Sequence, residues 1–364
     1  FATVGKAPCY RVFGEVEELG AAEIADADFE AFLAACLPPG MQARIEAERD
    51  VDVGISLSDT ERYRLNFFYE SGRLAMVARR VPLGNLSFEE LRLPKVISDF
   101  SLASRGLLLI TGSTGSGKSS TMAALLHHIN SEQSKHIITI EDPIEFVHRD
   151  DQSIVTQREV GNDTQSFASA LRHVVRQSPD VIFIGEMRDA ETIETAISAA
   201  MTGHLVVTTM HTVDPAQTIE RIIGYFPEGQ RDQLALDFSI SLVGIVSQRL
   251  LHKKEAEGLL PAFEILVATP LIRRAIAARQ LDEVSDLLRA GGTEGMITFT
   301  RSLADLVQRG EVAIEAAAAA ATNREEFLLA VQGMETGIES LRRQAVDGDG
   351  RRASMRSLLR AAVK

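Results

Sequence analysis

The sequence predicts an α/β protein in which a parallel-sheet core follows a small α+β domain and precedes a helical region. Two observations carry this prediction. From about residue 95, apolar runs alternate with helical patterns, which is typical of a mostly parallel sheet covered on both faces. A glycine-rich segment at 112–119 also separates the first of these runs from the next helix. The length of 364 residues fits two or three domains.

Residues 1–82 are expected to form the small α+β domain. They contain β-like runs at 63–69 and 74–78 and a helical stretch near 28–37. Because residue 1 is Phe rather than Met, we allow for a domain that is truncated at its start. The segment from Pro82 to Pro94 contains two prolines and a glycine, so residues 83–94 are expected to be a linker.

Residues 95–229 are expected to form the core. Its strands are predicted at 107–111, 136–140, 181–184 and 205–209, and its helices near 118–130, 164–177 and 189–201. Residues 230–340 are expected to be mainly helical, including the alanine-rich stretch 315–321, and to form a third region. A basic tail at 341–364 follows.

The segment 112–119 has the spacing of a phosphate-binding loop, with Gly112, Gly117, Lys118 and Ser119 at the defining positions. Backbone N–H groups of such a loop and of the following helix point at phosphate oxygens. Lys118 can reach the β- and γ-phosphates, and the Ser119 hydroxyl can ligate Mg²⁺. A plain Gly/Ser-rich turn would not require that lysine and serine. We therefore predict a site for ATP with Mg²⁺, formed by Ser113, Thr114, Gly115, Ser116, Gly117, Lys118, Ser119 and Ser120.

Acidic residues follow two of the predicted strands. Glu141 and Asp142 come after the strand at 136–140, and Glu186 comes after the strand at 181–184. Carboxylates at the carboxyl ends of parallel strands can hold Mg²⁺ through water or orient the attacking water. One such acid alone favours a helix cap or a solvated turn. Two of them in one sheet, after a phosphate loop, favour a catalytic site.

Two histidines flank the strand at 205–209, namely His204 and His211. Histidine can donate to a γ-phosphate and so report its presence. A zinc site is disfavoured, because two histidines without a nearby cysteine supply too few ligands.

The bulk composition narrows the choice of partner and compartment. A net charge of −13 and a pI near 5.2 argue against nucleic acid as the main partner. Two cysteines, Cys9 and Cys36, fit a reducing compartment, and we find neither a membrane-spanning run nor an export signal. The tail 341–364 has seven Arg or Lys against two Asp. It fits an anionic membrane surface or a partner, and equally a frayed or packed terminal helix.

Four ordered segments resemble the Walker A, Asp box, Walker B and His box of the secretion ATPase superfamily, most closely its PilT/PilU retraction ATPases of type IV pili. The resemblance extends from about residue 4 to residue 330. The four segments are "GSTGSGKS", "TIEDPIEFVH", "DVIFIGEMRD" and "TGHLVVTTMHT"; further matches are "QREVGNDT", "GYFPE", "SQRLL" and "GGTEGM".

The resemblance implies a PAS-like N-terminal domain and a RecA-like core. Glu141 would assist at the metal and water, Glu186 would be the catalytic base and His211 would sense the γ-phosphate. Arg64 and Arg79 match family arginines that reach the phosphates from the N-terminal domain.

The resemblance also implies ATP hydrolysis that drives pilus retraction and twitching motility. The implied partners are five further copies in a homo-hexamer, an inner-membrane pilus platform protein and a paralogous pilus ATPase. The implied location is peripheral, on the cytoplasmic face of the inner membrane.

Other functions stay open. The chain lacks the tetracysteine module of assembly and type II secretion ATPases, which favours retraction. The doublet Arg79-Arg80 and "ATNREEF" at 321–327 lean towards an accessory, PilU-like ATPase, and "TPLIRRAIAAR" at 269–279 departs from the commoner form of the retraction motif. An ATP-binding scaffold is disfavoured by the intact Lys118 and Glu186, and a DNA-translocating motor by the net charge.

Overall fold

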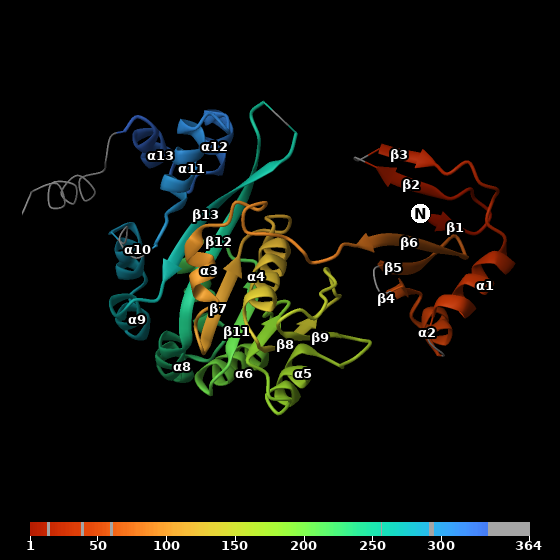
Figure 1. Ribbon diagram of the computed structural model, residues 1–364, viewed down its shortest axis with the longest axis horizontal. Coiled ribbons are helices and arrows are strands. Elements are labelled where there is room, and N and C mark those ends of the chain that lie inside the picture. Colours follow the sequence, from red (N-terminus) through yellow and green to blue (C-terminus); the bar gives the residue numbers. More distant parts are fainter. Residues whose placement is uncertain (13–14, 38–39, 59–60, 256, 291–294, 334–364) are drawn as a thin grey trace, which may run out of the picture.

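The computed structural model describes residues 1–12, 15–37, 40–58, 61–255, 257–290 and 295–333. Figure 1 shows a small N-terminal domain beside a central sheet, with a group of helices on the other side of that sheet. The predicted α/β class is confirmed. The basic tail at 341–364 and the first part of "GGTEGM" at 291–294 lie outside the described residues.

The N-terminal domain is an antiparallel sheet with two helices on one face. The sheet order is β1-β6-β5-β4, and a separate hairpin pairs β2 with β3. The elements are β1 (Ala2–Thr3), β2 (Cys9–Val12), β3 (Glu15–Glu18), α1 (Asp26–Cys36), α2 (Met41–Glu48), β4 (Asp50–Ser58), β5 (Glu61–Glu70) and β6 (Arg73–Val81). Alternate residues such as Val53, Leu65 and Phe67 pack against the helices. The other face of β5 therefore carries the polar residues Arg62, Arg64 and Asn66.

The core is a seven-stranded sheet with the order β13-β12-β7-β11-β10-β8-β9. All neighbouring strands are parallel except β12 and β13. The strands are β7 (Gly106–Thr111), β8 (His136–Glu141), β9 (Ile154–Glu159), β10 (Val181–Ile184), β11 (Leu205–Met210), β12 (Leu242–His252) and β13 (Leu259–Val267).

Helices cover both faces of this sheet, so β7, β10 and β11 are buried at every position. The apolar cluster on one face includes α3 (Lys95–Phe100) and α4 (Lys118–Glu132). The cluster on the other face includes α5 (Phe167–Val174), α6 (Ala190–Met201), α7 (Pro215–Gly224) and α8 (Glu228–Ser241). Ser166, Asp189 and Asp214 accept backbone N–H bonds at the starts of α5, α6 and α7, which fixes where these helices begin.

One expectation from the sequence is corrected. Residues 230–340 are not mainly helical throughout, because β12 and β13 lie within them and belong to the central sheet. The sheet therefore continues well past residue 229.

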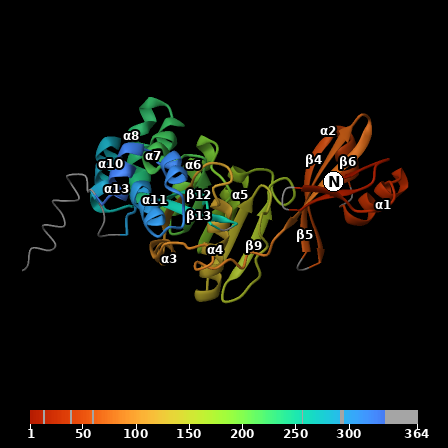
Figure 2. The same cartoon turned by 90° about the horizontal axis from the view of Figure 1, so that it is seen from above.

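The helices after β13 are α9 (Pro270–Ala277), α10 (Leu281–Ala290), α11 (Phe299–Gln308), α12 (Ile314–Ala320) and α13 (Arg324–Val331). Three of them, α11, α12 and α13, pack with the distal parts of β12 and β13 around Phe299 and Phe327. Figure 2 shows α11 and α13 at the end of the molecule that lies away from the N-terminal domain. Within the part of the chain that the structure describes, no helix combines the length and apolar character needed to cross a bilayer.

The linker after β6 is bonded to the core at its start and to the C-terminal helical group near its end. Gly84 N–H donates to the Val147 carbonyl at 2.8 Å, and Val147 N–H donates to the Pro82 carbonyl at 3.1 Å. Near the other end, Arg92 forms an ion pair with Glu311 at 2.6 Å.

Candidate active site

The phosphate loop lies between β7 and α4, as expected. Gly112 has φ 148°, and a Cβ there would lie 2.4 Å from Ser116 Oγ and 2.5 Å from the Gln248 carbonyl oxygen. Gly117 has φ 89° and precedes the first residue of α4. The two glycines are therefore required by close approach and by backbone conformation, and they let the loop curl at the amino end of α4.

Lys118 extends back over the loop. Its Nζ donates to the carbonyl oxygens of Gly112 at 2.9 Å and Ser113 at 3.0 Å. The residue is only 8% exposed, and this burial lowers the pKa of its ammonium group, while Glu186 and Glu145 act in the opposite direction. The carbonyl oxygens and the two carboxylates therefore stabilise the charged ammonium group of Lys118, the one cation of the loop, where it is partly shielded from water.

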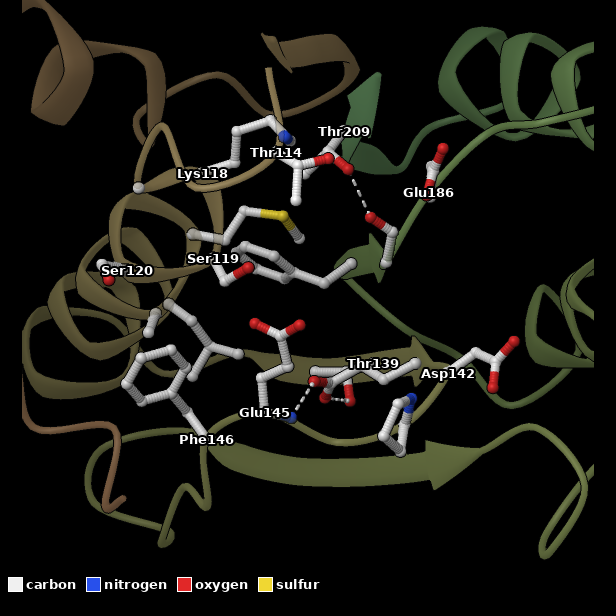
Figure 3. A pocket seen from close by; sticks show the side chains of 18 of the residues that line it. Thr114, Lys118, Ser119, Ser120, Thr139, Asp142, Glu145, Phe146, Glu186 and Thr209 are labelled. Carbon is white, nitrogen blue, oxygen red and sulfur yellow. Dashed lines mark hydrogen bonds between the residues drawn. The ribbon is translucent and has the colours of Figure 1, made fainter. Parts of the chain in front are cut away.

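A cavity of about 640 Å³ opens beside this loop at the carboxyl ends of the strands. Figure 3 shows Thr114, Lys118 and Ser119 along one side of the cavity and Glu145 pointing toward it from the other side. The polar residues that line it are Arg64, Thr114, Lys118, Ser119, Ser120, Thr139, Glu141, Asp142, Glu145, His148, Glu186, Arg188, Thr209 and His211. The position agrees with the general rule that ligands bind at the carboxyl edge of parallel strands.

His211 connects the lysine of the loop to the acid after β10. Its Nδ1 lies 3.4 Å from Lys118 Nζ, and its Nε2 lies 3.3 Å from Glu186 Oε2. A neutral imidazole with its proton on Nε2 satisfies both contacts, because it donates to the carboxylate and accepts from the ammonium group. Arg188 also contacts Glu186 Oε2, at 2.8 Å.

Glu141 ends β8 and is bonded from three sides. Thr139 Oγ1 donates to it at 2.6 Å, Gln157 Nε2 at 3.0 Å and the Glu145 backbone N–H at 3.3 Å. Burial raises the pKa of the Glu141 carboxyl, and these hydrogen bonds oppose the rise. Asp142 also lines the cavity but is exposed.

The predicted arginines differ in position. Arg64 lines the cavity from the N-terminal domain. Arg79 is the cross-strand partner of Arg64 on β6, but it is exposed and does not line the cavity. His204 is not brought to the site. It lies at the amino end of β11, where its Nδ1 is 2.9 Å from the Ala199 carbonyl oxygen of α6, so its contact is with the fold and not with the cavity.

Sequence reasoning missed Gln248, which holds the phosphate loop from β12. Its Nε2 donates to the Ser116 carbonyl oxygen at 2.6 Å, and its Oε1 accepts from Thr121 Oγ1 at 2.9 Å. The residue is 2% exposed. The only signal in the sequence was its place in the "SQRLL" segment.

The donors around the cavity fit a hard cation that arrives with phosphate. Among the described residues, no group of three or more His, Cys, Asp or Glu side chains is arranged to hold a metal ion unaided. Ser119, Glu141 and Glu186 nevertheless line the same cavity and offer only oxygen. Oxygen ligands shared between protein, water and phosphate are what Mg²⁺ takes in such sites.

A parallel sheet with a phosphate loop, and with acids from two further strands at the same edge, defines a nucleotide-binding protein of the P-loop class. Comparison with known proteins is more specific. The chain belongs to the family described as Type II/IV secretion system protein, whose model matches residues 74–347.

Individual relatives cover nearly the whole chain. The twitching motility protein of Neisseria gonorrhoeae is 39% identical over 320 residues, or 88% of this chain and 86% of that protein. The type IV pilus ATPase PilU of Pseudomonas aeruginosa is 35% identical over 342 residues, or 94% of this chain and 90% of that protein. The crystal structure of the pilus retraction motor PilT with bound ADP superposes with a TM-score of 0.82 at 39% identity, covering 89% of this chain and 93% of that one.

Proposed function

We propose that this chain is an ATPase motor that drives retraction of type IV pili. The observation that carries the proposal is that His211 contacts both Lys118 and Glu186 at one cavity, in a chain that is similar to PilT over most of its length. The same relatives support ATP as the nucleotide, because the superposed PilT structure contains ADP.

The chemistry divides among the residues that line the cavity. Lys118 and the loop N–H groups bind the phosphates, and the Ser119 hydroxyl is the residue that would hold Mg²⁺. When bound, that ion neutralises charge that develops on the transferring phosphoryl group. Glu186 orients the attacking water and accepts its proton, and Glu141 supports the water and metal from the neighbouring strand. Because His211 contacts both Lys118 and Glu186, it links the occupancy of the phosphate subsite to the position of the base.

Arg64 adds positive charge from a second domain. Charge that develops on the transferring phosphoryl group is stabilised only while that domain lies against the core. Hydrolysis and domain movement are then coupled, which is what a motor requires. We assign a weaker role to Arg79. Because it does not line the cavity of its own chain, it would act at the nucleotide site of a neighbouring subunit.

The assembly we propose is a homo-hexamer that acts on an inner-membrane pilus platform protein at the cytoplasmic face of the membrane. The tail at 341–364, with seven Arg or Lys against two Asp, offers a basic segment for that surface. A paralogous pilus ATPase is a further proposed partner.

An accessory role is the second candidate. PilU covers 94% of the chain, against 89% for the PilT of the same organism, although the identity is 35% against 38%. An accessory motor would need its paralogue for retraction, whereas an independent motor would not.

Two measurements test the proposal. Purified protein should hydrolyse ATP only with Mg²⁺, and a deletion strain should keep its surface pili but stop retracting them. Complementation with the wild type, but not with Glu186→Gln, should restore retraction. Loss of pili in the deletion strain would instead indicate an assembly ATPase, and Mg²⁺-dependent ATP binding with no turnover would indicate a scaffold. Restoration that needs a paralogue would indicate the accessory role.

A further inference from the structure

Two arginines project from the same face of β5. Side chains two residues apart in a strand share a face, so Arg62 and Arg64 both face the core. Only Arg64 reaches the cavity. Arg62 instead donates from Nη2 to Glu159 Oε2 at 2.7 Å, and the side chains of the pair are 18% and 4% exposed. This ion pair joins the N-terminal domain to the end of β9 in the core.

The carboxylate of Glu159 also touches the loop that borders the cavity. The same oxygen, Oε2, accepts the backbone N–H of Ile144 at 3.1 Å, and Oε1 accepts from Asn162 Nδ2. Ile144 lies between Asp142 and Glu145, two of the residues that line the cavity. One buried carboxylate therefore binds an arginine of one domain and the acidic loop of the other.

Gly54 on β4 leaves room for this pair. A Cβ at that position would lie 2.6 Å from Arg62 Nη2 and 2.8 Å from each carboxylate oxygen of Glu159. Its φ is outside the left-handed region, so its backbone suits any residue. The glycine is thus required by the close approach of the ion pair to the strand.

Arg64 has little of its own to hold it in place. Among the residues that the structure describes, it pairs with Asp52 at 3.4 Å, and both side chains are more than a third exposed. Exposed pairs of this kind contribute about 0–1 kcal/mol. The position of Arg64 therefore depends on where β5 lies, and the buried pair of Arg62, two residues away, holds β5 against the core.

We propose that Arg62 and Glu159 position Arg64 in the nucleotide cavity, and that Glu159 links this placement to the loop at 142–146. Arg62 is a positioning residue that acts through Arg64. Its Nε is buried without a hydrogen-bond partner among the described residues, so the pair is not arranged for maximal stability. A contact of that kind suits two domains that approach and separate. The inference rests on the proposed function for its effect on rate.

The test compares variants from both sides of the contact with a matched control. Arg62→Gln removes the charge, and Gly54→Ala pushes the pair apart with a methyl group while both charges remain. Each should lower kcat for ATP hydrolysis about 10- to 100-fold, because a displacement of about 1 Å has that effect on positioned groups. KM for ATP should change little, since the phosphate loop is untouched. Arg62→Lys should recover part of the loss. The control is Arg44→Gln, which breaks an exposed Arg44–Glu48 pair of 2.7 Å in the same domain and should leave kcat unchanged.

A distance measurement separates positioning from stability. Spin labels at Glu30→Cys and Glu194→Cys, in a chain with Cys9 and Cys36 replaced by Ser, report the distance between the domains. Labelled chains are diluted into unlabelled ones, so only distances within a chain are seen. The distance distribution should broaden or shift in Arg62→Gln and Gly54→Ala, change less in Arg62→Lys, and stay as in the wild type in Arg44→Gln.

The outcomes are separable. An unchanged distance in Arg62→Gln and Gly54→Ala overturns the proposal, as does a shifted distance with unchanged kcat in a wild type that hydrolyses ATP. A wild type without turnover refutes the proposed function, yet the distance measurement still decides whether the pair sets the domain position.

Discussion

Replacing Gln248 with Met should destabilise the core through the phosphate loop. Methionine has a similar length but cannot replace the two buried hydrogen bonds, to the Ser116 carbonyl and from the Thr121 hydroxyl. A buried group left without a partner costs about 1–3 kcal/mol, so the two cost about 2–6 kcal/mol. At about 2–4 °C per kcal/mol for a unit of this size, the melting temperature should fall by at least about 4 °C.

Differential scanning calorimetry measures this effect directly, and the transition to follow is that of the core. ATP should also bind more weakly to Gln248→Met, because the loop is less well ordered before binding. The control is Gln233→Met on α8, which removes only an exposed bond to Asp237 at 2.8 Å. Equal melting temperatures for Gln248→Met and the control would refute the idea that this glutamine holds the loop.

Further predictions concern chemistry, subunit contribution and pH. Lys118→Ala should largely abolish ATP binding and hydrolysis, whereas Glu186→Gln should bind a nucleotide analogue normally and fail to hydrolyse ATP; loss of binding in the second variant would make Glu186 structural. Mixed rings of Glu186→Gln with Arg64→Ala should stay inactive, since Arg64 lines the cavity of its own chain. Mixed rings of Glu186→Gln with Arg79→Ala should recover activity if a neighbouring subunit supplies Arg79. Recovery with Arg64→Ala would contradict the assignment of Arg64 to the site of its own chain. Burial lowers the pKa of His148 from 6.5 to about 4. As pH falls, this histidine therefore takes up its proton in the unfolded chain before it does so in the folded one. The free energy of unfolding should fall by about 3 kcal/mol between pH 6.5 and 4. His148→Gln should lose less over that range in denaturant titrations, and an identical pH profile would exclude this histidine as the cause.

The phosphate loop and the strands around it could be predicted because their signals are local. Gly112 to Ser119 are contiguous, and Glu141 and Glu186 each directly follow an apolar run. Once the strands are parallel, their carboxyl ends meet at one edge, so the acids and the loop had to come together. The same argument could have excluded His204. A six-residue strand separates its ends by about 20 Å, so His204 and His211 cannot share one edge of the sheet.

The parts that escaped prediction depend on contacts between distant residues. Strand β12 is buried on both faces over most of its length, and such an apolar run cannot be distinguished from a buried helix by its periodicity. The role of Gln248 could not be predicted for the same reason, because this glutamine reaches the phosphate loop only when β12 lies beside β7. Arg62 and Glu159 are 97 residues apart, and neither belongs to a local pattern that indicates an ion pair.

The bonded linker changes what kind of tether joins the two domains. As a free chain, residues 83–94 could extend over about 40 Å. The bonds of Pro82 and Gly84 to Val147 leave almost no free chain after Val81, where β6 ends. The N-terminal domain can therefore pivot about this point but cannot diffuse away, which keeps the effective concentration of Arg64 at its own cavity high and independent of protein concentration. The approach of Arg64 to its own cavity is then set by an angle between the domains and not by a search for a distant group.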